Sequence, residues 1–108
     1  METIAFRMIL LPGHEREYRK RHDQIWPELV EALRTAGVCE YRIFLDPQTN
    51  HLFAILRRAR DHQMDALRDS AVMRRWWEMM SDIMETNPDA SPREVALGEM
   101  FCLDGAET

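Results

Sequence analysis

A β-hairpin is predicted by residues 38–58, VCEYRIFLDPQTNHLFAILRR. The turn falls at residues 46–50, because proline, aspartate and asparagine favour tight turns and all three occur there. Before the turn, alternate residues share one apolar face, and they are Cys39, Tyr41, Ile43 and Leu45. After the turn, residues 51–58 are apolar on both faces. A strand of that kind is expected in the middle of a sheet, with cover on both sides.

Apolar residues recur at three- and four-residue steps on both sides of this hairpin, which predicts helices within residues 14–36 and 61–84. Pro27 lies inside the first stretch and is expected to kink the helix or begin a new one, because proline lacks a backbone N–H. Gly37 is expected to end that stretch. Ser70 predicts an internal N-cap, so the second stretch is also expected in two pieces.

Two further strands are predicted at residues 3–10 and 95–103, where apolar residues alternate. The order strand, helix, strand, strand, helix, strand is the ferredoxin-like βαββαβ arrangement of the α+β class. Right-handed crossovers then give an antiparallel sheet with the helices on one face. The second and fourth strands lie on opposite edges of such a sheet, so Cys39 and Cys102 are expected too far apart to pair. Both are expected to be small, reduced core residues.

The face of the sheet away from the helices also needs cover, because the strands at residues 3–10 and 51–58 are expected to be apolar on both faces. Two such sheets packed face to face would provide this cover. The pattern therefore predicts a homodimer. The length of 108 residues indicates one domain, spanning residues 1–108.

The composition narrows the class of partner. Fourteen basic and nineteen acidic residues give a net charge of −5, which argues against nucleic acid as the main partner. There is no run of eighteen apolar residues, so no membrane partner is expected. Residues 1–7 lack the basic start and long apolar region of a signal peptide, and a cytoplasmic location is expected.

The candidate catalytic residue is His22. Tyr18 lies four residues before it and Trp26 four residues after it, so the three side chains would share one helical face. Histidine gives and takes protons near neutral pH, and the two aromatic rings each carry a polar tip. A small polar molecule such as a sugar could use all three. The alternative is that Tyr18 and Trp26 belong to the core and that His22 is an ordinary surface residue.

Trp76 and Trp77 form the second unusual feature. Neighbours on a helix point about 100° apart, so both indoles cannot lie in the same core layer. One is expected to pack inward and the other to line the mouth of a cavity. With Tyr18 and Tyr41 they predict an aromatic pocket around His22, where the C–H faces of a sugar would stack. The alternative is that these rings only fill the core between helix and sheet.

Motifs for other chemistry are missing. His14, His51 and His62 have no metal-ligand spacing, and there is no nucleophile motif, glycine-rich phosphate loop or dinucleotide-binding fingerprint. The sequence therefore predicts no metal and no cofactor. Two classes of function remain, which are acid–base chemistry without a cofactor and simple binding.

Several segments of the chain resemble the L-rhamnose mutarotase family, among them residues 87–92 (NPDASP). The blocks Arg21-His22…Ile25-Trp26-Pro27-Glu28 and Trp76-Trp77 are specific in combination. The resemblance extends over about residues 5–103. It implies a dimeric ferredoxin-like α/β barrel that interconverts the α and β anomers of L-rhamnose. It also implies that His22 is the proton donor and that four residues bind the sugar, namely Tyr18, Tyr41, Trp76 and Trp77.

This activity agrees with the residues, since anomer exchange needs one group to protonate the ring oxygen and another to take the anomeric hydroxyl proton. His22 suits the first role. The second group is left open, and water or a carboxylate could serve. Other functions also stay open: a mutarotase for another deoxysugar such as L-fucose, a monooxygenase-like α/β barrel, or a binding protein without turnover.

Overall fold

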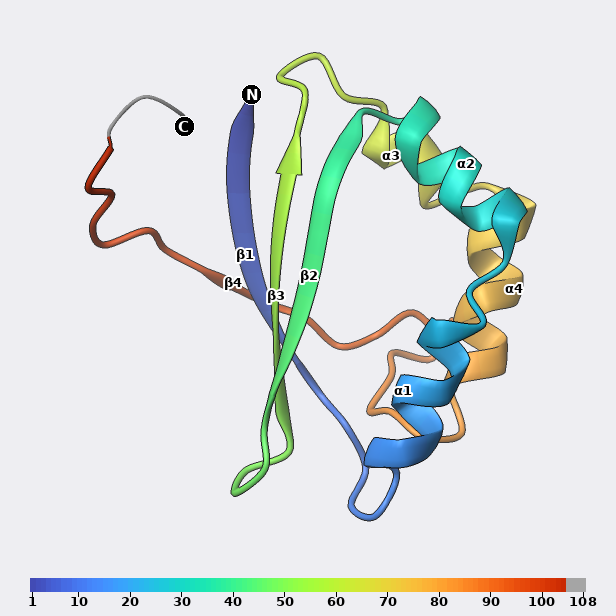
Figure 1. Ribbon diagram of the computed structural model, residues 1–108. Helices are drawn as coiled ribbons and strands as arrows, with labels where there is room; N and C mark the ends of the chain where they lie inside the picture. Colours follow the sequence, from blue (N-terminus) through green and yellow to red (C-terminus); the bar gives the residue numbers. More distant parts are fainter. Residues whose placement is uncertain (105–108) are drawn as a thin grey trace.

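Residues 1–104 of the chain are described by the computed structural model, in which an antiparallel sheet packs against helices on one side (Figure 1). The strands are β1 (Glu2–Ile9), β2 (Val38–Asp46), β3 (His51–Arg58) and β4 (Val95–Leu97). The helices are α1 (Glu15–Asp23), α2 (Pro27–Thr35), α3 (Met64–Leu67) and α4 (Ala71–Met80). The strand order β2-β3-β1-β4 confirms the predicted ferredoxin-like α+β topology.

The helices lie on one side of the sheet, which we call the inner face (Figure 1). Leu52, Ala54 and Leu56 of β3 occupy this face and expose at most 1% of their surface. Their neighbours on β1 and β2 point the same way, because paired residues of antiparallel strands share a face. Leu52, for example, lies between Met8 and Leu45. This layer forms the floor of the core, and β3 is central as predicted.

Local sequence signals end and begin the helices where they were expected. α1 ends at Asp23 and Pro27 is the first residue of α2, with Trp26 between them in an extended conformation. A residue before proline is driven to that conformation by steric conflict with the ring. Ser70 caps α4, since its hydroxyl accepts a hydrogen bond from the Met73 amide at 3.3 Å. The break at Pro27 and the cap at Ser70 are therefore confirmed.

A bulge in β2 corrects the prediction for Cys39. Val38 lies opposite Arg58 and Glu40 opposite Arg57, so one extra residue is inserted between the two pairs. Val38 consequently points to the inner face and is buried, whereas Cys39 is exposed. The predicted face of β2 holds from Tyr41 onward, but the expectation of a buried Cys39 is wrong.

The last strand is shorter than predicted. β4 pairs with β1 only from Val95 to Leu97, and the chain then leaves the sheet. Without a neighbouring strand the apolar residues beyond it stay exposed, 78% for Phe101 and 85% for Leu103. Cys102 lies in the same segment and is also exposed, so it is not a core residue. Both cysteines are free. Cys39 belongs to β2 and Cys102 follows β4, and these two strands lie on opposite edges of the sheet as expected.

The outer face of the sheet also carries exposed apolar side chains. Four exposed side chains from three strands gather on it, namely Phe44, Ile55, Val95 and Leu97. The register places them together, because Ile55 and Leu97 both lie opposite Ala5, while Phe53 lies between Phe44 and Arg7. No helix within residues 1–104 is long and apolar enough to cross a membrane.

Gly37 allows a test of the turn between α2 and β2. Its φ of +106° is rarely adopted by L-residues, and a Cβ there would meet the Cα and Cβ of His62 at 3.3 Å. Gly13 is the control, since its φ is +84° but nothing lies within 4 Å of such a Cβ. We expect Gly13→Ala to cost about 1–2 kcal/mol of unfolding free energy from backbone strain, and Gly37→Ala to cost more. Urea denaturation measures both, and equal losses would contradict the crowding at His62.

Candidate active site

A cavity of about 1360 Å³ lies between the helices and the inner face of the sheet. It is lined by all five residues that the sequence singled out, namely Tyr18, His22, Tyr41, Trp76 and Trp77. They come from α1, β2 and α4, which are far apart in the sequence. The fold therefore brings the predicted site residues to one place.

His22 is half-buried in the cavity wall. Its ring lies 4.3 Å from that of Tyr18 and meets Trp76 edge-on at 5.4 Å, measured between ring centres. Its Nδ1 lies 3.0 Å from the Tyr18 carbonyl oxygen. Because a carbonyl only accepts, this nitrogen carries the proton, and Nε2 is left for other partners. Burial lowers the pKa of His22, while the Tyr18 carbonyl and the Asp23 carboxylate act in the opposite direction.

The tandem tryptophans differ in their surroundings. Trp76 exposes 8% of its surface and packs edge-on against Trp26 at 5.2 Å between ring centres. Trp77 is partly buried, and the guanidinium of Arg68 lies 5.3 Å from the centre of its ring. Both indoles line the cavity. Trp26 packs against the core and supports Trp76, as the alternative interpretation of that residue held.

Tyr18 and Tyr41 place two phenols in the cavity. Tyr18 is buried, whereas Tyr41 keeps 38% of its surface open and meets Phe6 edge-on. Desolvation raises the pKa of both residues above the usual range of tyrosine, and electrostatic interactions with Tyr18 and Glu94 add to the effect on Tyr41. Both phenols stay neutral near pH 7. They are suited to hydrogen bonding with hydroxyl groups rather than to removing protons.

Glu94 also lines the cavity, although no sequence pattern pointed to it. It directly precedes β4, and its carboxylate lies 3.6 Å from the Arg68 guanidinium. Burial raises the pKa of Glu94, and Arg68 partly opposes this shift. Glu94 lies two residues beyond the segment 87–92 (NPDASP), which stops short of it. Its position just before a predicted strand was the only available signal.

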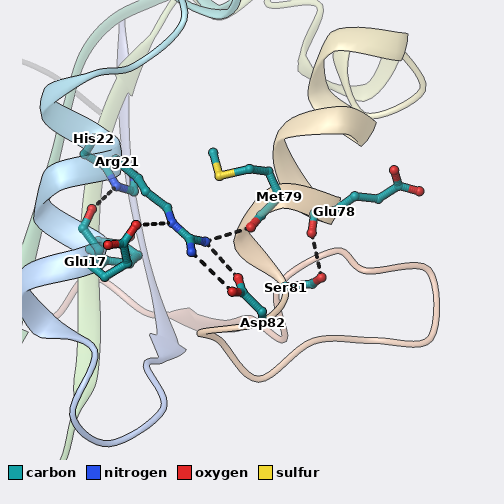
Figure 2. Close-up of polar contacts among 8 residues, drawn as sticks. Glu17, Arg21, His22, Glu78, Met79, Ser81 and Asp82 are labelled. Atoms are coloured by element: carbon teal, nitrogen blue, oxygen red, sulfur yellow. Dashed lines mark hydrogen bonds and ion pairs between the residues drawn. The ribbon is translucent and has the colours of Figure 1, made fainter.

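Arg21 fixes the helix that carries His22 (Figure 2). Its guanidinium donates to the Met79 carbonyl oxygen at 2.7 Å and to both Asp82 carboxylate oxygens at 2.8 and 3.2 Å. It also donates to Glu17 at 2.7 Å on its own helix. The two carboxylates raise the pKa of Arg21, so it remains charged. These contacts tie α1 to the end of α4, which holds His22 beside Trp76.

The model of the family described as L-rhamnose mutarotase matches residues 3–103. This chain belongs to the L-rhamnose mutarotase family. An L-rhamnose mutarotase of Burkholderia ambifaria is 61% identical over 95% of this chain and 99% of the relative. One from Paraburkholderia phytofirmans is 59% identical over 96% and 97%.

Solved structures agree with this family assignment. The crystal structure of an L-rhamnose mutarotase from Formosa agariphila superposes with a TM-score of 0.88 at 43% identity, covering 95% of this family member and 99% of that chain. A Bordetella bronchiseptica protein, whose name refers to antibiotic biosynthesis monooxygenases, has a TM-score of 0.64 at 14% identity, covering 94% and 100%. That second likeness shows the fold alone.

Within residues 1–104, no group of three or more histidine, cysteine, aspartate and glutamate side chains is arranged to hold a metal ion. That the mutarotase works without metal or cofactor stays a prediction.

The lowered pKa of His22 predicts how stability depends on pH. Its value in the folded protein lies below the 6.5 of an unperturbed histidine, so the unfolded chain binds more protons in the interval between the two. The free energy of unfolding is therefore highest above that interval and falls as the pH drops through it, by at most about 1.4 kcal/mol per pH unit.

His22→Asn removes the titration and keeps an N–H that can reach the Tyr18 carbonyl. Urea denaturation of both proteins from about pH 8 to about pH 5 should show a steeper loss for the wild type. Parallel curves would rule out a depressed pKa.

Proposed function

We propose that this chain interconverts the α and β anomers of L-rhamnose without a cofactor. The observation that carries the proposal is the position of His22, an acid–base group in the wall of a cavity that Tyr18, Tyr41, Trp76 and Trp77 also line. Family membership supports the choice of sugar, because relatives with 56–61% identity are named L-rhamnose mutarotases. All 108 residues are proposed to act as one mutarotase domain.

The aromatic walls suit a deoxysugar. The indoles of Trp76 and Trp77 offer flat surfaces for the C–H groups of the ring. The neutral phenols of Tyr18 and Tyr41 can donate to or accept from its hydroxyl groups. We assign sugar binding to these four residues.

His22 is assigned as the proton donor. In the charged ring, Nε2–H gives its proton to the ring oxygen of the sugar while a second group takes the proton of the anomeric hydroxyl. The bond between the anomeric carbon and the ring oxygen breaks, and an aldehyde forms. Rotation of the aldehyde and closure on its other face, with both proton transfers reversed, complete the exchange. A lowered pKa makes the imidazolium a stronger acid, and such a group contributes about 10²–10⁴-fold.

Saturation-transfer NMR on the anomeric signals of L-rhamnose tests this function. The wild type should accelerate exchange, and His22→Asn should reduce the acceleration by about 100-fold or more. His51→Asn is the matched control, since His51 lies at the hairpin turn and not in the cavity wall.

Parallel runs with L-fucose and D-glucose measure the preference for the sugar. L-rhamnose should be the best substrate. An unchanged rate in folded His22→Asn would contradict the proton-donor assignment, and faster exchange of L-fucose would contradict the choice of substrate.

We propose that the protein works as a homodimer joined through the outer face of the sheet. Phe44, Ile55, Val95 and Leu97 are exposed together there, and a contiguous apolar surface of this kind favours association. Ile55→Glu would place a charge in the centre of the contact. We expect this variant to be a monomer by sedimentation velocity, whereas Glu31→Lys on the opposite, helical side should remain a dimer. A monomeric wild type would overturn the proposal.

We also propose a cytoplasmic location. Cys39 and Cys102 are both exposed and free, and exposed thiols persist most readily in a reducing compartment.

A further inference from the structure

Ring opening moves two protons, and His22 accounts for only one of them. The phenols of Tyr18 and Tyr41 are poor candidates for the other, because burial raises the pKa of each. Five carboxylates line the cavity, namely Glu15, Asp23, Asp65, Glu94 and Glu99. Among them, Glu94 forms an ion pair with Arg68 at 3.6 Å, and the Arg68 guanidinium lies over the ring of Trp77.

The backbone aims Glu94 into the cavity. Val95 and Leu97 lie opposite Arg7 and Ala5 and belong to the outer face. Since side chains alternate along a strand, Ala96 and the preceding Glu94 point to the inner face. Pairing with β1 holds this segment in place, and the Glu94 side chain keeps 32% of its surface open. A carboxylate in this position is fixed by the sheet rather than by a free loop.

His22 and Glu94 are each held next to an aromatic ring of the cavity wall. The ring of His22 packs on Tyr18 at 4.3 Å, and Glu94 pairs with the Arg68 guanidinium that lies over Trp77. His22 and Glu94 belong to α1 and to the segment before β4, so they approach a bound molecule from different elements of the fold.

We propose that Glu94 is the second proton-transfer group of anomer exchange, and this inference rests on the proposed mutarotase function. The ionised carboxylate takes the proton of the anomeric hydroxyl while Nε2–H of His22 gives its proton to the ring oxygen. The bond between the anomeric carbon and the ring oxygen breaks, and the anomeric C–O single bond becomes the aldehyde double bond. After rotation, Glu94 returns its proton to the carbonyl oxygen and the His22 imidazole takes back the proton of the ring-oxygen hydroxyl. No oxidant or reductant is needed.

The surroundings of the two groups favour this exchange. Burial raises the pKa of Glu94, against the opposing charge of Arg68, and lowers the pKa of His22, against Tyr18 and Asp23. Both shifts make the two pKa values more similar. Over a narrow pH range, two groups with similar pKa values share a single proton. Either group can carry that proton at a small cost in free energy. Arg68 also lies over Trp77, so one cation positions the carboxylate next to a ring of the pocket.

Glu94→Gln tests the assignment, since it keeps the shape of the side chain and removes its titration. We expect L-rhamnose exchange to fall about 100-fold or more, while the Kd of the sugar, followed by tryptophan fluorescence, changes far less. The pH–rate profile should lose its two-sided shape and keep a single limb. Glu31→Gln, which removes a carboxylate of α2 that does not line the cavity, should keep the wild-type rate and profile.

Two further measurements distinguish a catalytic role of Glu94 from a structural one. Formate supplied to Glu94→Ala should restore part of the rate, because a free carboxylate can enter the vacated space. Arg68→Gln removes a charge that lowers the pKa of Glu94, so the pH–rate profile should move to higher pH.

Full activity of Glu94→Gln would overturn the inference while leaving the mutarotase function intact. A loss of rate with an unchanged profile, and without formate rescue, would overturn it as well, since that result indicates a structural role. Absence of exchange in the wild type would instead overturn the proposed function itself.

Discussion

Arg21 joins the helix that carries His22 to the chain beyond α4, and the geometry of the cavity depends on this junction. The ion pair itself adds little stability, because 66% of the Asp82 side chain is exposed and such pairs are worth roughly 0–1 kcal/mol. The contribution of this ion pair is to set the orientation of α1. A guanidinium that is held by two carboxylates and a carbonyl fixes the position of α1 relative to α4. The neighbouring residue, His22, therefore meets Trp76 at a defined angle.

The same burial acts in opposite directions on the titratable groups of the cavity. Removing water disfavours the charged form of each group, which lowers the pKa of His22 and raises those of Glu94, Tyr18 and Tyr41. The phenols become weaker acids, which suits the hydrogen-bonding role proposed for them. The imidazole and the carboxylate become more alike in proton affinity. Burial therefore distinguishes the proposed sugar-binding phenols from the proposed proton-transfer pair.

Features that depend on a few neighbouring residues could be predicted from the sequence. The kink at Pro27, the cap at Ser70 and the alternation in β3 follow from local sterics and hydrogen bonding, and His22 and Trp76 were found from their spacing on helices. Features that depend on partners distant in the sequence could not be predicted from it. Arg21 and Asp82 are 61 positions apart, and Glu94 meets its ion-pair partner Arg68 only in the folded chain. The exposed Cys39 results from a bulge, which alternation alone does not reveal.

The register of the sheet links the cavity to the proposed dimer. Each residue of β3 serves one face only: Leu52, Ala54 and Leu56 form the floor beneath the helices, and Ile55 belongs to the outer surface. A slip of one residue would exchange the two faces and also turn Tyr41 out of the cavity. The short hairpin turn prevents this slip by fixing Asp46 opposite His51, and the bulge restores Val38 to the core at the far end. Site and contact surface are therefore two consequences of one register, and neither can change without the other.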